Sequence, residues 1–263
     1  MKNETLLYDD GNHKCIMFSL EDEDHSEYTL SVNQFLIIQK TSAVLVDPGS
    51  GGIFGELYDA VSAHIDPQKI KYIFFSHQDP DVAGAIAQWS VATSAKLVIS
   101  QLWTRFMGHY GLMDMGRIIA LEDHGARIKM GEDYLQFIPA HFLHSPGNFS
   151  LYDSRSKILF SGDIGAAVLS PQNLNKNVDD FEEHRPFLES FHSRYMASNR
   201  FCRAWVRSVR RYDVEMIAPQ HGSLFKENRA QQFLEWFENV QGGLEHCDKL
   251  YGFEQQDTDQ KAE

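Results

Sequence analysis

Short apolar runs alternate with polar stretches along most of the chain, and they fall into two kinds. Brief runs of β-branched and aromatic residues are typical of buried strands, and they occupy residues 35–38, 44–46, 72–75, 97–99, 134–138, 158–160 and 215–218. Apolar residues at helical spacing predict helices over residues 54–65, 187–210 and 226–244. Because strand pairs come early and the longer helices come late, the pattern predicts two sheets covered by helices.

The chain shows no sign of a division into separate domains. No long Pro/Gly/Ser-rich or charge-block linker occurs, so we expect residues 1–253 to form one domain, followed by a flexible polar tail over residues 254–263. The N-terminus has no apolar signal core, and no stretch approaches a membrane span, which predicts a cytoplasmic protein with no membrane association. The cysteines are scattered without a CxxC pair, which suits a reducing compartment and argues against a disulfide scaffold or a thiolate zinc knuckle; they are Cys15, Cys202 and Cys247.

The charge balance limits the kinds of partner. A formal charge of −13 argues against a general surface for nucleic acid or anionic membrane. A local basic stretch on a predicted helix is best interpreted as a solvated face; it contains Arg203, Arg207, Arg210 and Arg211. We therefore expect no nucleic-acid partner.

The most informative pattern follows the apolar run at residues 72–75, which ends in His77, Asp79 and Asp81 at every second position. On an extended strand, residues four apart are separated by about 13 Å, whereas metal–ligand bonds measure about 2.0–2.2 Å. A straight strand could not wrap His77 and Asp81 around one ion, so Pro80 and its turn-like setting predict a curl after the strand. His77 and Asp79 could then bind one ion, with Asp81 at the start of the next helix facing a second. Alternatively, a surface loop with acidic capping residues would look the same.

Potential ligands also follow three further apolar runs. His144, with His141 nearby, follows residues 134–138; Asp163 and His221 follow two others, with Gly or Pro close by. Strand ends are where sites assemble in α/β sheets. Any one of these residues could be a hydrogen-bonded histidine or a capping aspartate. Together they predict a metal site whose ligands are His77, Asp79, Asp81, His144, Asp163 and His221.

The ordered set of motifs resembles the metallo-β-lactamase superfamily over nearly the whole chain. Its parts are Leu45-Val-Asp47-Pro-Gly49, His77-x-Asp79-x-Asp81, His144, Asp163 and His221-Gly222. The resemblance implies an α+β fold, the αββα sandwich, in which two mixed β-sheets are flanked by helices and a two-metal site lies at one edge. It also implies that Asp47 is a buried supporting residue rather than a ligand.

The residue at position 79 indicates which branch of the superfamily the chain resembles. Hydrolases of the superfamily usually carry a histidine where this chain has Asp79, whereas the flavodiiron branch has a carboxylate, usually Glu, and binds iron. Further stretches similar to that branch are residues 31–37, 142–148, 194–199 and 217–222. The chain is most similar to oxygen-binding diiron proteins, which keep the diiron domain without a flavodoxin domain. This resemblance implies two Fe ions and no flavin in the chain.

By position, the resemblance implies that iron one is bound by His77, Asp79 and His144. It implies that Asp81 and His221 bind iron two, with Asp163 bridging. Val82 stands where the branch usually has a histidine, so iron two loses an imidazole. Three imidazoles and three carboxylates suit Fe or Mn on chemical grounds, and Zn is the remaining alternative.

Two functions follow from these expectations. The first is a non-haem diiron protein that binds O2 or NO, as an oxygen sensor or carrier, or as a reductase fed by a separate electron donor. A separate redox or signalling protein would then be its partner, and a homodimer is possible. The alternative is a two-metal zinc hydrolase acting on a thioester, lactone or phosphodiester, in which the metals generate a hydroxide nucleophile. Asp79 and Val82 argue against the hydrolase.

Overall fold

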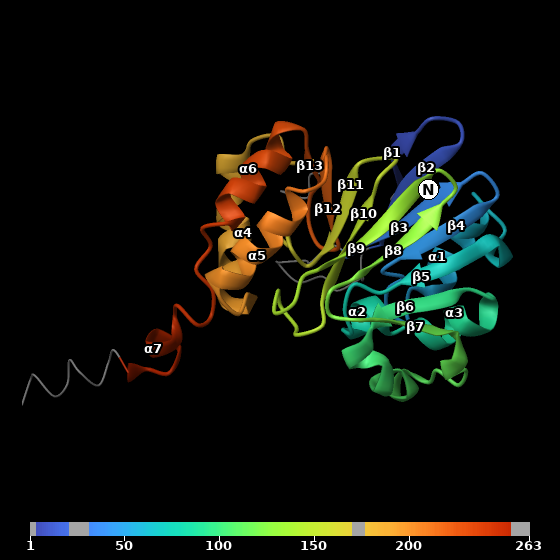
Figure 1. The fold of residues 1–263 in the computed structure, drawn as a ribbon, viewed down its shortest axis with the longest axis horizontal. Coiled ribbons are helices and arrows are strands. Elements are labelled where there is room, and N and C mark those ends of the chain that lie inside the picture. The colour runs from blue at the N-terminus through green and yellow to red at the C-terminus, as the bar shows by residue number, and fades with distance from the viewer. Residues whose placement is uncertain (1–3, 21–31, 170–176, 254–263) are drawn as a thin grey trace, which may run out of the picture.

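A computed structural model of the chain describes residues 4–20, 32–169 and 177–253. Two sheets pack face to face, with helices outside each of them (Figure 1). The first sheet has seven strands in chain order: β1 (Glu4–Asp9), β2 (His13–Leu20), β3 (Val32–Gln39), β4 (Ser42–Val46), β5 (Ile70–Phe74), β6 (Lys96–Ser100) and β7 (Ile118–Leu121). The second has six: β8 (Ala126–Met130), β9 (Asp133–Pro139), β10 (Phe149–Asp153), β11 (Ile158–Gly162), β12 (Met216–Pro219) and β13 (Phe225–Lys226).

Both sheets are mixed. In the first, β1 to β4 pair antiparallel and β4 to β7 pair parallel. In the second, β11 and β12 form the parallel pair and the other neighbours are antiparallel. The expected sandwich of two mixed sheets is therefore confirmed.

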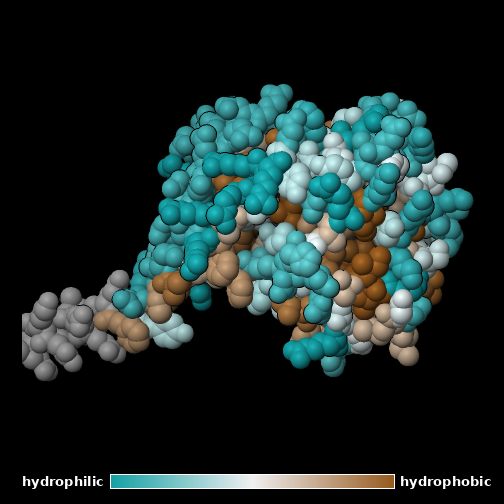
Figure 2. Space-filling model, in the orientation of Figure 1, coloured by the Kyte–Doolittle hydropathy of each residue, from teal (hydrophilic) through white to brown (hydrophobic). Residues whose placement is uncertain are grey.

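The helices form two outer layers. The α-helices are α1 (Phe54–Ser62), α2 (Pro80–Ala83), α3 (Ile86–Ala92), α4 (Phe181–Tyr195), α5 (Asn199–Val209), α6 (Asn228–Phe237) and α7 (Cys247–Leu250). Within the described ranges there are also three 3-10 helices: Pro67–Lys69, Gln101–Tyr110 and Met115–Arg117. Figure 1 shows α4, α5 and α6 on the outer side of the second sheet, and Figure 2 shows that their outward surface is largely hydrophilic. Among the described residues, none of the helices combines the length and the apolar composition needed to cross a membrane.

Alternation along the strands explains the layers. Side chains of successive residues on a strand point to opposite faces. On β2, Cys15 and Met17 pack in the core between the sheets, whereas Ile16 and Phe18 pack beneath α1 and α3. A third apolar cluster lies between the second sheet and α4 to α6. Three buried layers hold four structural layers together, which is the αββα arrangement.

The single helix predicted over residues 187–210 is wrong, because two helices occupy that stretch. The chain is extended at Met196, whose side chain is fully buried. The carbonyls of Met196 and Ala197 accept hydrogen bonds from Gly243 and Leu244, at 2.7 and 2.8 Å. These tertiary hydrogen bonds take the place of the hydrogen bonds of a continuous helix, and burial of the Met196 side chain stabilises the extended conformation.

The helix predicted over residues 226–244 is also too long, since α6 ends at Phe237. Residues 243 and 244 leave the helical path to make the hydrogen bonds to Met196 and Ala197. Leu244, predicted on the apolar stripe, is 69% exposed for the same reason. The predicted tail at residues 254–263 lies outside the described residues.

Candidate metal centre

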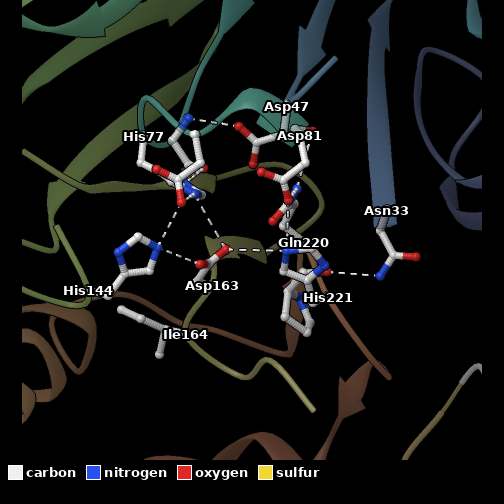
Figure 3. Close-up of polar contacts among 12 residues, drawn as sticks. Asn33, Asp47, His77, Asp81, His144, Asp163, Ile164, Gln220 and His221 are labelled. Carbon is white, nitrogen blue, oxygen red and sulfur yellow. Dashed lines mark hydrogen bonds and ion pairs between the residues drawn. The ribbon is translucent and has the colours of Figure 1, made fainter. Parts of the chain in front are cut away.

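All six predicted ligands meet at one edge of the sandwich, where strands of both sheets end (Figure 3). His77 follows β5, and Asp79 and Asp81 belong to the turn into α2. His144 lies between β9 and β10, and the remaining two, Asp163 and His221, directly follow β11 and β12. The structure therefore brings together, from four connections, all six side chains that the sequence predicted as ligands.

The predicted curl after β5 is present. Asp79 is the N-terminal capping residue of α2, with extended backbone angles of φ −64° and ψ 152°, and Pro80 takes the first helical position. Proline suits that position because its fixed φ is helical and its missing N–H has no helical partner there. One ligand atom each from His77, Asp79 and Asp81 lies within 4.8 Å of the others. A straight strand could not achieve this.

Asp163 lies at the centre of the cluster. Its Oδ2 is 2.8 Å from Nε2 of His144, and its Oδ1 is 3.7 Å from Nε2 of His77 and 3.9 Å from Nε2 of His221. The other close pairs are His144 with Asp79, at 3.4 Å, and His221 with Asp81, at 3.0 Å. The two oxygens of Asp163 therefore face different histidines.

A glycine makes this placement possible. Gly162, directly before Asp163, has φ +63°, and a Cβ there would lie 3.1 Å from the Cβ of Ser76. Ser76 in turn precedes His77 in the chain. Glycine permits both the left-handed backbone and the close approach of the two strand ends.

The buried ligand atoms fit a cation. His77 Nε2 and Asp163 Oδ1 are buried and have no hydrogen-bond partner among the residues that the structure describes. The other ring nitrogens of His77 and His144 lie 2.9 and 3.0 Å from the hydroxyls of the adjacent Ser76 and Ser145. These hydroxyls can hold Nδ1–H, which leaves the Nε2 lone pairs free to point inward, as in metal-ligating histidines. Unpaired buried polar atoms are costly unless a ligand satisfies them.

The charges of the cluster also favour a cation. Burial would raise the pKa of Asp163, but the neighbouring His77 and the hydrogen bond from His144 hold it well below its usual range. Burial lowers the pKa of His144, yet hydrogen bonds to Asp163 and Asp79 raise it to about 10. Burial likewise opposes the lowered pKa of Asp81, which the hydrogen bond from His221 produces. Asp163 and Asp81 thus remain ionised and need positive charge nearby, which a metal ion would supply in place of a proton on His144.

Several supporting residues surround the ligands. Asp47 is buried and accepts a 2.7 Å hydrogen bond from the backbone N–H of Ser76, in agreement with its expected supporting role; burial raises its pKa to about 6. The sequence interpretation missed Gln78, which donates to Asp79 at 2.7 Å, and Gln220, which donates to Asp81 at 3.2 Å. Both residues are next to a predicted ligand in the sequence, and this adjacency could have indicated their supporting role.

Two other residues singled out by the sequence lie outside the cluster. His141 is turned away, with Nε2 2.6 Å from the carbonyl oxygen of Asp123. Val82 is fully buried in the apolar cluster beneath the first sheet. It offers no lone pair, so the position of the missing imidazole is not filled by this side chain.

Comparison with known proteins identifies the family of the chain. The sequence profile of the ODP family beta lactamase matches residues 30–222. The chain belongs to the ODP family. The flavodiiron resemblance expected from the sequence is confirmed, since flavo-diiron proteins are among the matching relatives.

Two solved structures of the chemotaxis sensor ODP match almost the entire chain. The peroxy diiron species has a TM-score of 0.83, and the apo state from T. denticola has a TM-score of 0.82. Each is 42% identical, over 94% of this chain and 99% of the sensor chain. The fold and the family are therefore shared with that sensor.

More distant relatives are longer proteins. The rubredoxin-oxygen oxidoreductase of Megalodesulfovibrio gigas is 25% identical over 82% of this chain and 56% of its own length. The anaerobic nitric oxide reductase flavorubredoxin of Aliivibrio salmonicida is 26% identical over 80% of this chain and 44% of its own length. The chain spans about half the length of these two relatives.

Proposed function

We propose that this protein is a non-haem diiron protein that binds O2 or NO and acts as a sensor of that gas. The observation that carries the proposal is the convergence of three imidazoles and three carboxylates around Asp163, whose two oxygens face His144 and His221. Its likeness to the chemotaxis sensor ODP over nearly the full length of both chains supports sensing over turnover. A separate redox or signalling protein would receive the output.

The residues divide into two sets around Asp163. His77, Asp79 and His144 would hold iron one, since Asp79 Oδ2 lies 3.7 and 3.4 Å from the inward nitrogens of the two histidines. Asp81 and His221 would hold iron two. When bound, the two irons would supply open coordination positions and the electrons for reversible binding of a diatomic gas.

The protein's own residues determine how open each position is. Asp79 and Asp81 have side chains 36% and 38% exposed, whereas His77 and Asp163 are 1% and 5% exposed. The cluster is therefore buried on the protein side and accessible from the edge of the sandwich. With Val82 in place of a histidine, the second set has fewer protein ligands, which leaves room for an exogenous molecule.

The hydrolase alternative is not favoured. The solved structures that match nearly the whole chain are of a diiron sensor, and more distant relatives are O2 and NO reductases. A carboxylate at Asp79 also makes the first set more anionic than a histidine-rich zinc site, which suits iron.

The test is anaerobic loading with Fe(II), followed by iron analysis and absorption spectroscopy on addition of O2 or NO. We expect two irons per chain and a spectral change with the gas. The variant His221→Ala should lose mainly the second iron, whereas His124→Ala, which alters a histidine 79% exposed on the surface, should lose none. Tight zinc binding with hydrolysis of a generic ester or phosphodiester, and no gas-dependent spectrum, would refute the proposal.

A further inference from the structure

A second cluster of metal-ligating side chains lies at the opposite end of the sandwich. We call it the His13 cluster, and its members are His13, Cys15, Asp153 and Ser156. Strand β10 separates it from the candidate metal centre: the N–H of Phe149, at one end of β10, binds the carbonyl of Ser76, and Asp153 is at the other end. The two clusters therefore share no residue.

The contacts within the His13 cluster are close. Nε2 of His13 is 2.6 Å from Oδ2 of Asp153, and the Ser156 hydroxyl donates to the same oxygen at 2.5 Å. Sγ of Cys15 lies 3.6 Å from this oxygen and 3.7 Å from Nε2 of His13. Each of the three ligand-type residues is at least 98% buried. The cluster therefore gathers an imidazole, a thiol and a carboxylate away from water.

One further observation indicates that these contacts do not fully satisfy the groups. Nε2 of His13 faces Asp153, but its Nδ1 is buried and has no hydrogen-bond partner among the described residues. A cation bound to the three groups would hold Cys15 as the thiolate, because a coordinated thiol loses its proton.

We propose that the His13 cluster binds one divalent cation of the Zn²⁺ class. Its ligands would be Sγ of Cys15, Nε2 of His13 and a carboxylate oxygen of Asp153, with the Ser156 hydroxyl or a water molecule as the fourth. Mixed sulfur, nitrogen and oxygen ligands suit Zn²⁺, which prefers four of them in a tetrahedron. Binding releases the thiol proton of Cys15 and the proton shared by His13 and Asp153 to solvent.

The geometry is close to what the ion requires. Bonds of about 2.0–2.3 Å in a tetrahedron place ligand atoms about 3.3–3.8 Å apart. The two distances from Cys15, at 3.6 and 3.7 Å, already match. The 2.6 Å contact between His13 and Asp153 is too short for two ligands of one ion, so the carboxylate of Asp153 must rotate as the cation replaces that hydrogen bond.

The position of the site gives it a structural role and an entry route. His13 and Cys15 belong to β2 of the first sheet, and Asp153 belongs to β10 of the second, so the cation would join the two sheets. His13 also lines a surface cleft of about 520 Å³, through which an ion can approach. The cation would stabilise the sandwich far from the gas-binding edge.

Co²⁺ is a specific probe, because a cobalt–thiolate bond gives charge-transfer absorption in the near ultraviolet and the ligands of the candidate metal centre include no cysteine. The protein to test is the full chain carrying Cys202→Ser and Cys247→Ser, in which Cys15 is the remaining thiol. Asp163→Asn is added to weaken competition from the other centre. We expect one equivalent of Co²⁺ to produce the thiolate band and one equivalent of Zn²⁺ to abolish it.

Two further variants test the ligand set. In a protein that keeps Cys202 and Cys247, the change Cys15→Ser should remove the band. His13→Gln, added to the protein that carries Cys202→Ser, Cys247→Ser and Asp163→Asn, should weaken Co²⁺ binding at least tenfold. Absence of the band in the protein whose remaining thiol is Cys15, with native circular dichroism, would overturn the proposal. A band that persists in Cys15→Ser would overturn it equally.

Discussion

The candidate metal centre and the His13 cluster use similar side chains at opposite ends of the same sandwich, and they differ in how their charges are met. At the centre, three carboxylates surround three imidazoles, and Oδ1 of Asp163 is buried without a hydrogen-bond partner in the described part of the chain. In the His13 cluster, the single carboxylate of Asp153 accepts hydrogen bonds from His13, Ser156 and the N–H of Arg155.

This difference suits the centre to binding exchangeable ligands and the His13 cluster to stabilising the fold. The negative charge of three carboxylates at an accessible edge needs cations, which can also bind another ligand. A closed pair of imidazole and carboxylate is already neutralised from within, so a cation there can only replace protons. We therefore expect substitutions at the centre to change the iron content, and substitutions at the His13 cluster to change stability and leave the iron content unchanged.

The largest effect is expected for Asp163→Asn. Because the two oxygens of Asp163 face both ligand sets, the amide should lose both irons together. Iron analysis after anaerobic loading measures this, with Asp123→Asn as an exposed control. Iron content equal to that of the parent would show that Asp163 does not bridge.

Asp153→Asn should lower the stability of the fold and leave the iron content unchanged. It removes one partner of a buried ion pair whose His13 side chain is 2% exposed. Breaking such a pair costs about 3–5 kcal/mol. Denaturant unfolding in the presence of a chelator measures the change, while iron loading at the other edge should stay near the parental level. An unfolding free energy within error of the parent would remove the stated contrast between the two clusters.

His192 tests the burial of an imidazole whose hydrogen bonds go to backbone groups. Its Nδ1 lies 2.7 Å from the carbonyl of Leu188 and its Nε2 accepts from the N–H of Gly165 at 3.0 Å, so the neutral ring is held. Burial lowers its pKa to about 4 from 6.5.

The neutral ring of His192 therefore contributes stability that is fully present above about pH 6.5 and is lost as the pH falls towards 4. A shift of this size corresponds to about 3 kcal/mol. Unfolding of the metal-free protein between pH 7 and pH 4 should show a weaker acid loss in His192→Gln than in the parent. Parallel curves for the two proteins would contradict this interpretation.

The smallest effect is expected for Gln220→Ala. It removes the hydrogen bond to Asp81 and leaves all six proposed ligands in place. Loss of such a supporting contact weakens metal binding by about tenfold at the low end of the usual range, or about 1.4 kcal/mol. Titration with Fe(II) should show weaker binding of the second iron only, with the exposed Gln241→Ala unchanged. If the binding of both irons is weakened equally, Gln220 supports the whole centre and not the second iron alone.

Much of the fold was accessible from the sequence because it is local. All seven predicted strand positions overlap observed strands, and ligand-type residues follow four of them. The strands that were not predicted are β1, β2, β7, β8, β10 and β13. Every residue of β10 is buried, but Ser150 interrupts its apolar run, so the strand was missed. The false helix over residues 187–210 was a local pattern overruled by the burial of Met196.

The sequence by itself determined which side chains follow the strands, and therefore the composition of the proposed iron site. Only the tertiary structure decided how they meet: that Asp163 turns one oxygen towards His144 and the other towards His221 depends on strand ends far apart in the chain. The same holds for the His13 cluster, whose two halves are separated by about 140 residues. No local preference of either segment records that contact, because it exists only once the two sheets have packed together.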